Sequence, residues 1–222
     1  MYSDVGTVYV RSIKYLIREM QRYKQDIFAS SSCYIERQWS KRDAFEIIGC
    51  NYEEYQNAFQ CEATFVLIKK TAFSIEFVKE WLMYCCDRRI VTDDENVLGK
   101  PNAVDFISNR HDQTAFSLLC KKHNIKAFRG ISDSSELYKF LQYKDGDFFG
   151  MTRQQLIENA LRHRASDEYA RGSYKRIIVN TRLQNTTKWL FCKRLVKKII
   201  INLRTDMRKK SIEGVFLDIK IL

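Results

Sequence analysis

Three short polar segments contain residue types suited to chemistry on phosphates or sugars. In the first, Tyr2–Gly6, Asp4 precedes a turn glycine. A carboxylate at a strand end suits a hard divalent cation, and open α/β sheets bind ligands at such ends. An aspartate is equally common as the residue that closes a turn. Both roles stay open for Asp4, metal ligand or turn residue.

The second segment is Trp39–Phe45, which combines an aromatic ring with charged side chains. A tryptophan offers an apolar plate for a sugar ring, and Lys41 and Arg42 are suited to phosphates or hydroxyls. Gln60 and Glu62 follow at the start of an apolar run. The alternative is a plain exposed helix start followed by a polar strand start.

The third segment, Asn109–Gln113, lies where a loop becomes a helix. A helix N-terminus favours negative charge, and a general base must be ionised and close to the proton it removes, which suits Asp112. Neutral imidazole binds divalent metals, which makes His111 a candidate ligand. The alternative is that Asn109 or Asp112 merely caps the helix. No spacing matches a zinc, P-loop or Ser-His-Asp signature.

Hydrophobic periodicity predicts alternating strands and helices around these segments. The predicted strands are residues 1–10, Cys61–Lys69 and Ile125–Phe128, and Asp93–Asp105 is a loop. The predicted helices are 13–20, Lys41–Ile48, Ser74–Cys86, His111–His123, 135–143, 153–164 and 188–205. Asp43 is expected to complete a capping box with Ser40, and Thr152 to cap 153–164. Helix 74–86 is expected to bury Phe77, Val78, Trp81, Leu82 and Cys85.

Composition favours one globular cytosolic chain. Hydrophobic residues make up 45% of the 222 residues, which argues against global disorder. No signal peptide and no apolar run long enough for a bilayer is visible. The seven cysteines include no CxxC pair, which favours reduced thiols over a zinc site or a disulfide framework.

Positive charge is concentrated near the C-terminus. Nine Lys and Arg residues against Asp206 alone give residues 188–210 a charge of +8, out of +11 for the chain. On a helical wheel these basic residues lie opposite an apolar face with Trp189, a pattern suited to an anionic lipid surface. The alternative is a helix that packs on the domain with a solvated basic face. We expect no nucleic-acid partner for the body of the chain, because it is close to neutral.

Taken in order, the segments YSDVG, WSKRDAF, QCEATFVLIKKT, SIEFVKEWLMYC, TDDENVLGKPN and NRHDQTAFSLL resemble a family of bacterial GT-A-like glycosyltransferases. These are nucleotide-diphospho-sugar transferases of surface-polysaccharide gene clusters. The resemblance covers about residues 2–128, and its specificity lies in the ordered set. It implies an incomplete GT-A-like α/β domain over 1–130. Beyond it, where little of the family's pattern is present, composition and periodicity predict a helical extension and polar linker over 131–176 and a basic amphipathic tail over 177–222.

The resemblance also implies roles for particular residues. Asp4 takes the place of the acidic motif that binds donor and metal (Mn²⁺ or Mg²⁺); His111 is the second candidate metal ligand on the chemical ground given above. Asp112 becomes the catalytic or acceptor-binding carboxylate, with His111 and Gln113 beside it. The implied substrate-binding residues are Trp39, Lys41, Arg42, Asp43, Gln60, Glu62, Asn102 and Arg110.

The expected function is transfer of a sugar from a nucleotide-diphosphate donor to a glycan or lipid-linked glycan, in the cytoplasm or at the inner face of the membrane. In this fold the strands that bind base and ribose precede the acidic motif, and they are absent here. We therefore expect an N-terminally truncated chain with little or no turnover, and an unpaired sheet edge near residues 1–10 or along Cys61–Lys69. The alternative is a non-catalytic binding module whose basic tail contacts nucleic acid or an anionic surface.

Overall fold

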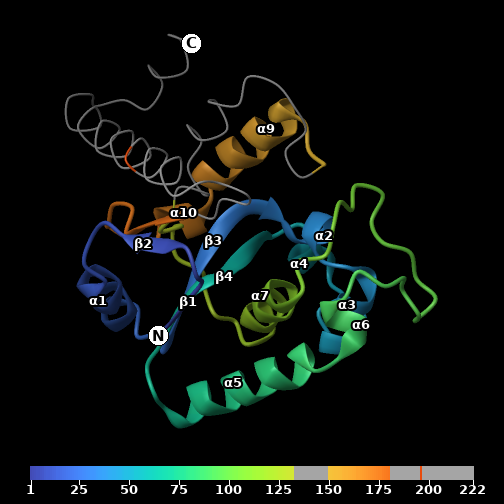
Figure 1. The fold of residues 1–222 in the computed structure, drawn as a ribbon, viewed down its shortest axis with the longest axis horizontal. Helices are drawn as coiled ribbons and strands as arrows, with labels where there is room; N and C mark the ends of the chain where they lie inside the picture. The colour runs from blue at the N-terminus through green and yellow to red at the C-terminus, as the bar shows by residue number, and fades with distance from the viewer. Residues whose placement is uncertain (133–149, 181–195, 197–222) are drawn as a thin grey trace.

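The centre of the protein is an antiparallel sheet of three strands in the order β1–β4–β3. The computed structural model describes residues 1–132, residues 150–180 and Val196 (Figure 1). The three strands are β1 (Tyr2–Ser3), β4 (Phe59–Ile68) and β3 (Ile27–Ile35). A second antiparallel pair joins β2 (Thr7–Tyr9) to β5 (Ile178–Asn180). The described chain is therefore mixed α/β with small antiparallel sheets.

Helices cover both sides of the long strands β3 and β4. In Figure 1, α9 (Arg153–Arg164) lies above these strands, whereas α7 (Asp112–Lys122) and α5 (Ala72–Cys85) lie below them. α9 packs on β3, α7 packs on β4, and α5 packs on α7. The shorter helices are α1 (Lys14–Arg22), α2 (Glu36–Trp39), α3 (Arg42–Ile48), α4 (Glu53–Gln56), α6 (Arg88–Val91) and α10 (Asp167–Ala170). Because both faces are covered, every residue of β3 is buried.

β3 is an element that hydrophobic periodicity does not predict. Three consecutive serines interrupt its apolar residues, so neither a two-residue alternation nor an apolar run is visible. In the structure each hydroxyl has a partner: Ser30 Oγ lies 3.5 Å from Glu62 Oε2, Ser31 Oγ donates to Phe128 O, and Ser32 Oγ donates to Gln60 O. A buried strand tolerates such serines because their hydrogen bonds offset desolvation.

The strongest sequence predictions are confirmed within two residues at each end. β4 corresponds to the predicted strand 61–69, α5 to helix 74–86, and α7 to helix 111–123. α9 coincides with helix 153–164, and its predicted cap is present, because Thr152 Oγ1 accepts from Gln155 N at 3.2 Å. The predicted loop 93–105 also contains no helix or strand.

Several local predictions are wrong. Val78 and Leu82, predicted to be buried, are 39% and 64% exposed; α5 buries Phe77, as predicted, and Tyr84, which was not predicted. The predicted capping box of Ser40 and Asp43 is absent, because the start of α3 has no side-chain cap. The Asp43 carboxylate accepts hydrogen bonds from Val97 N and Leu98 N instead. Residues 125–128 form no strand, only a parallel bridge from Phe128 to Ser30. Of the two predicted positions for a sheet edge, β4 is wrong because it lies between β1 and β3, whereas β1, within residues 1–10, is an edge strand.

Within the predicted extension and polar linker of 131–176, the polar and charged part at 165–176 contains α10 and buries Tyr174 and Arg176. The predicted helices 135–143 and 188–205 lie outside the described residues, apart from Val196. Among the helices that the structure describes, none is both long and apolar enough to cross a bilayer.

Candidate functional site

A buried polar network joins the predicted site segments behind β4. Gln113 Oε1 accepts from Ala63 N at 3.2 Å, and Gln113 Nε2 donates to Gln60 Oε1 at 2.7 Å. Gln60 Nε2 in turn donates to Trp39 O at 3.3 Å. Gln60 is fully buried, so these bonds satisfy an amide that has no access to water. The network connects the start of α7 to β4 and to the end of α2.

Asn109 extends this network to α3 and α6. Thr114 Oγ1 lies 3.1 Å from Trp39 O and 3.0 Å from Asn109 Oδ1. Asn109 Oδ1 also accepts from Lys41 N at 3.4 Å, and its Nδ2 donates to Ile90 O at 2.7 Å. Asn109 therefore does not cap α7 but ties three segments together, which places Trp39 and Lys41 within one rigid unit.

Trp39 and Arg110 are stacked on one another. The Arg110 guanidinium carbon lies 4.3 Å from the Trp39 ring centroid and 5.5 Å from that of Tyr34. Burial lowers the pKa of Arg110, while the face of the indole offsets part of the lost hydration. Trp39 is 1% exposed, so a sugar ring can stack on it only if these neighbours move away.

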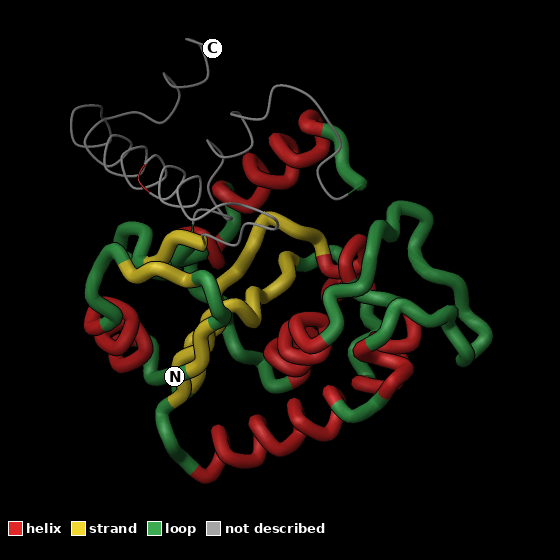
Figure 2. Tube along the Cα trace, in the orientation of Figure 1, coloured by secondary structure: helices red, strands yellow, loops and turns green. Residues whose placement is uncertain are grey.

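The start of α3 is wrapped by the long loop (92–111), which Figure 2 shows in green at the right edge of the molecule. Asn102 Oδ1 accepts from Arg42 N at 2.7 Å. The Asp43 carboxylate accepts from Val97 N at 2.7 Å and from Leu98 N at 3.3 Å. Arg42 and Asp43 of the segment Trp39–Phe45 thus form hydrogen bonds that attach the long loop to the start of α3.

We expect Asp43→Ala to lower the free energy of unfolding by about 1–3 kcal/mol, because two loop N–H groups lose their acceptor. Urea denaturation measures the loss, and hydrogen exchange should show faster exchange at Val97 and Leu98. Asp167→Asn, at an exposed position on α10, is the control. Unchanged exchange at both amides in Asp43→Ala would contradict this role.

His111, Asp112 and Gln113 point in three directions. His111 has the unusual backbone angles φ 53° and ψ −118°, and its Nε2 lies 3.2 Å from Asp93 Oδ2. Asp112 lies in the first turn of α7, near Cys85 of α5. Burial, and next to it the negative charge of the Asp112 carboxylate, raise the pKa of the Cys85 thiol to about 11. Gln113 points to β4, as described above. If Asp4 and Asp112 both take part in the chemistry, we expect their side chains to face the same cleft.

Asp4 lies beside the part of β4 that carries Glu62. Its backbone N donates to Thr64 O at 2.9 Å, and its Oδ1 accepts from Tyr2 Oη at 2.7 Å. Glu62 is 6% exposed, with its Oε2 3.5 Å from the hydroxyls of Ser30 and Ser132. Asp4 and Gln113 therefore bind adjacent residues of β4, Thr64 and Ala63, next to Glu62. The structure thus brings three predicted site residues to one short stretch of strand.

The predicted metal ligands do not form a complete metal-binding site in the described residues. Within residues 1–132 and 150–180, no three His, Cys, Asp or Glu side chains lie close enough to hold a metal ion. His111 pairs with Asp93 rather than with Asp4. A single carboxylate still fits Mg²⁺, which proteins often bind through one or two carboxylates together with substrate phosphates. Asp4 therefore stays a candidate ligand for a cation that is bound together with a substrate phosphate.

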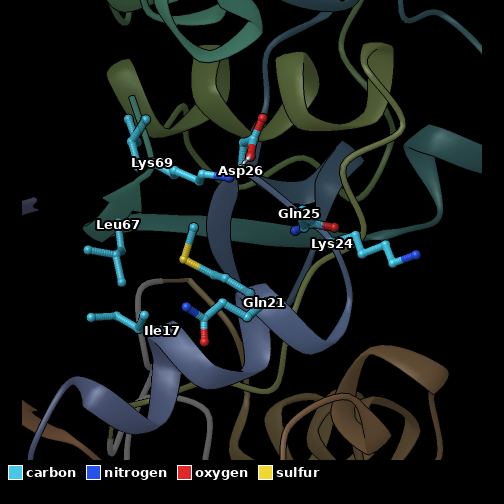
Figure 3. Close-up of a pocket in the computed structure, with 9 residues that line it drawn as sticks. Ile17, Gln21, Lys24, Gln25, Asp26, Leu67 and Lys69 are labelled. Carbon is cyan, nitrogen blue, oxygen red and sulfur yellow. Dashed lines mark ion pairs between the residues drawn. The ribbon is translucent and has the colours of Figure 1, made fainter. Parts of the chain in front are cut away.

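Two cavities are relevant to ligand binding. The larger, of about 580 Å³, lies between α1 and the end of β4 (Figure 3). Its lining includes Ile17, Gln21, Asp26, Leu67 and Lys69 but none of the predicted site residues. A smaller pocket of about 260 Å³ opens between the long loop and the start of α3, and we call it the loop pocket.

The loop pocket gathers residues from several of the segments that carry the family resemblance. It is lined by Lys41, Asp93, Asp94, Asn102, Phe106, Ile107, Ser108 and Asn109. Lys41 and Asn102 are predicted site residues; Asp93, Asp94 and Phe106 are not. The adjacent carboxylates in TDDEN were the available signal, but acidic pairs in loops are too common to single out.

The fold and these sites define a mixed α/β protein with a small antiparallel sheet and a buried polar network behind it. Comparisons of the chain with protein-family models, with curated proteins and with solved structures find no match.

Proposed function

We propose that this chain is a glycosyltransferase of surface-polysaccharide synthesis, which moves a sugar from a nucleotide-diphosphate donor to a hydroxyl of a glycan or lipid-linked glycan. The observation that carries the proposal is the network from Ala63 through Gln113 and Gln60 to Trp39. Three segments that resemble the family meet there, although they lie far apart in the sequence. The GT-A-like fold and a location at the cytoplasmic side of the membrane belong to the same proposal.

On the donor side, Asp4 is the residue that we assign to the diphosphate. It is half-buried at the end of β1, which limits the hydration that a bound cation would have to displace. A bound Mg²⁺ or Mn²⁺ would neutralise negative charge on the leaving diphosphate. Asp4 would hold the cation, and its hydrogen bond from Tyr2 Oη would orient the carboxylate.

On the acceptor side, Asp112 is the candidate general base. Its side chain is exposed, and its backbone O accepts from Trp81 Nε1 at 3.1 Å, which anchors the first turn of α7. The carboxylate would remove the proton of the acceptor hydroxyl as that oxygen attacks the anomeric carbon. Gln113, anchored on β4, fixes the position of this turn relative to Asp4.

The test is paramagnetic NMR with Mn²⁺ and UDP, or GDP in a parallel sample. We expect Mn²⁺ to broaden the amide signals of Ser3, Asp4 and Thr64 only when a nucleoside diphosphate is present. Asp4→Asn should weaken this effect at least 10-fold, because the charged ligand is lost. Asp167→Asn should leave it unchanged.

Broadening that is independent of the diphosphate, or that is equal in Asp4→Asn, would refute the assignment of the donor site. It would favour the alternative of a non-catalytic binding module, in which the buried polar network serves only stability.

A further inference from the structure

We propose that the loop pocket binds one monosaccharide unit, and that its role is to hold the sugar of the acceptor. The assignment to the acceptor rests on the proposed function, whereas the binding of a sugar ring rests on the pocket alone. The pocket measures about 260 Å³, slightly below the range of about 300–1,000 Å³ common for drug-sized ligands. A single ring fits this size better than a nucleotide does.

The polar groups of the loop pocket include both donors and acceptors. Lys41 is 2% exposed, and its Nζ donates to Asp94 O at 2.6 Å, which uses one of the three N–H donors of an ammonium. Asn102 uses its Oδ1 for Arg42 N and Asn96 Nδ2, so that its own amide N–H groups are available to a ligand. Asp93 and Asp94 supply carboxylate oxygens. Sugar hydroxyls both donate and accept, so they suit such a mixture.

The apolar part of the pocket suits the C–H face of a sugar. Phe106 and Ile107 line it next to the polar groups. Phe106 N donates to Ala103 O at 2.9 Å and Ile107 N donates to Gln38 O at 2.9 Å, which holds this part of the loop in place. An aromatic ring beside carboxylates and amides can pack against the ring carbons while the hydroxyls are hydrogen-bonded.

The charges of the pocket disfavour a phosphate ligand. Lys41 contributes one positive charge to the lining, and Asp93 and Asp94 contribute two negative charges. Arg88, which is not part of the lining, donates from Nε to Asp94 Oδ2 at 2.6 Å. Together Lys41 and Arg88 balance the two carboxylates, so the pocket holds no surplus of positive charge for a phosphate. A neutral hydroxyl-rich ligand needs no such surplus, and the carboxylates serve as acceptors for its O–H groups.

Hydrogen bonds within the chain hold the walls of the loop pocket in place without a ligand. Arg37 Nε donates to both oxygens of Asp105, at 2.9 and 3.1 Å, and Gln38 Nε2 donates to Asp105 Oδ2 at 3.0 Å. With the bonds from Asp43 to Val97 and Leu98, the long loop is tied on both sides of the pocket. A preorganised pocket loses less entropy on binding. Asn109 also joins the loop pocket to the buried polar network behind β4, which includes Gln113, the residue after Asp112.

The experiment is saturation-transfer NMR with the methyl glycosides of glucose, galactose and N-acetylglucosamine, followed by amide shift mapping with the best binder. We expect shifts confined to residues 93–109 and at least 10-fold weaker binding in both Phe106→Ala and Asp93→Asn. The matched controls are Phe73→Ala, an exposed ring on α5, and Asp167→Asn, and both should bind like the unmodified chain.

Two outcomes would overturn the inference: no transfer to any glycoside, or shifts at Ile17, Met20 and Leu67 around the cavity of Figure 3. If the diphosphate effect at Asp4 persists when glycosides do not bind, the pocket assignment fails and the donor site stands. If glycosides shift residues 93–109 while Mn²⁺ and UDP do nothing at Asp4, the sugar pocket is supported and the proposed donor site fails.

Discussion

Replacement of Lys121 by methionine should lower the free energy of unfolding by about 3–5 kcal/mol, the cost of leaving one partner of a buried ion pair alone. Lys121 Nζ lies 2.9 Å from Glu36 Oε2, and the Glu36 side chain is fully buried. Ser40 Oγ and Ser117 Oγ also donate to this carboxylate, at 2.9 and 2.8 Å. Without Lys121 the two hydroxyls cannot neutralise its charge.

Urea denaturation of Lys121→Met against Lys122→Met measures this effect with a matched control. Lys122 pairs with Glu80 at 2.7 Å, but its side chain is 38% exposed, so its loss should cost less than about 1 kcal/mol. If the two variants have equal free energies of unfolding, the buried Glu36–Lys121 ion pair does not contribute more to stability than the exposed pair, and the prediction is wrong.

The pH dependence of the Lys121 contribution has a defined sign. Burial, the largest single influence, lowers the pKa of Lys121, but the charge and hydrogen bond of the Glu36 carboxylate, together with Cys61 and Glu168, raise it by more in sum, so the net direction is upward. A raised lysine pKa means that the stabilisation is fully present below the ordinary value of about 10.4 and is lost only as pH rises through the higher folded-state value. The difference between Lys121→Met and the unmodified chain should therefore not change as a result of Lys121 titration between pH 6 and 9.

Trp39→Ala should cost about 3–5 kcal/mol of stability, the usual range for truncating a buried aromatic residue. The indole is 1% exposed and packs against Tyr34 at a ring distance of 5.0 Å, with Arg110 on its face. Its removal leaves a cavity and takes away the ring that compensates a buried guanidinium. Trp39→Phe should recover part of the loss, because a ring remains.

This variant separates two roles of Trp39. If the indole is a sugar platform, Trp39→Ala should keep the unfolding midpoint and lose glycoside binding. If it is part of the core, as its burial indicates, the midpoint should fall. Tyr52→Ala, which removes a ring that is 60% exposed, controls for truncation of an aromatic residue at the surface. A midpoint as high as that of Tyr52→Ala would contradict a core role.

The fold was most predictable where one physical signal dominated. β4 has a run of β-branched and aromatic residues, and α9 has a cap whose side chain bonds as predicted. β3 escaped prediction because its serines are buried by tertiary contacts that come from far along the chain, such as Phe128 O. Hydrophobic periodicity shows which residues are apolar. It does not show which polar residues will be buried and hydrogen-bonded in the core.

The candidate site was predictable only in part, for a related reason. Lys41, Asp43 and Gln60 were selected because they are polar and lie in motifs, and all three are buried and bonded to the chain itself. A sequence does not tell whether a polar side chain is paired with a ligand or with a backbone group. Asp93, Asp94 and Phe106 were missed because only the folded loop brings them to one pocket.

The long loop also affects how readily the ligand preference proposed for the loop pocket could change. Its attachments lie on both sides of a tip at 103–104, where Val104 is completely exposed. Lengthening a surface loop costs little, because closure entropy grows only with the logarithm of length. Insertions at this tip should therefore alter the loop pocket while the sheet and the buried network stay as they are, so that the sugar preference proposed for the pocket could change without loss of the fold.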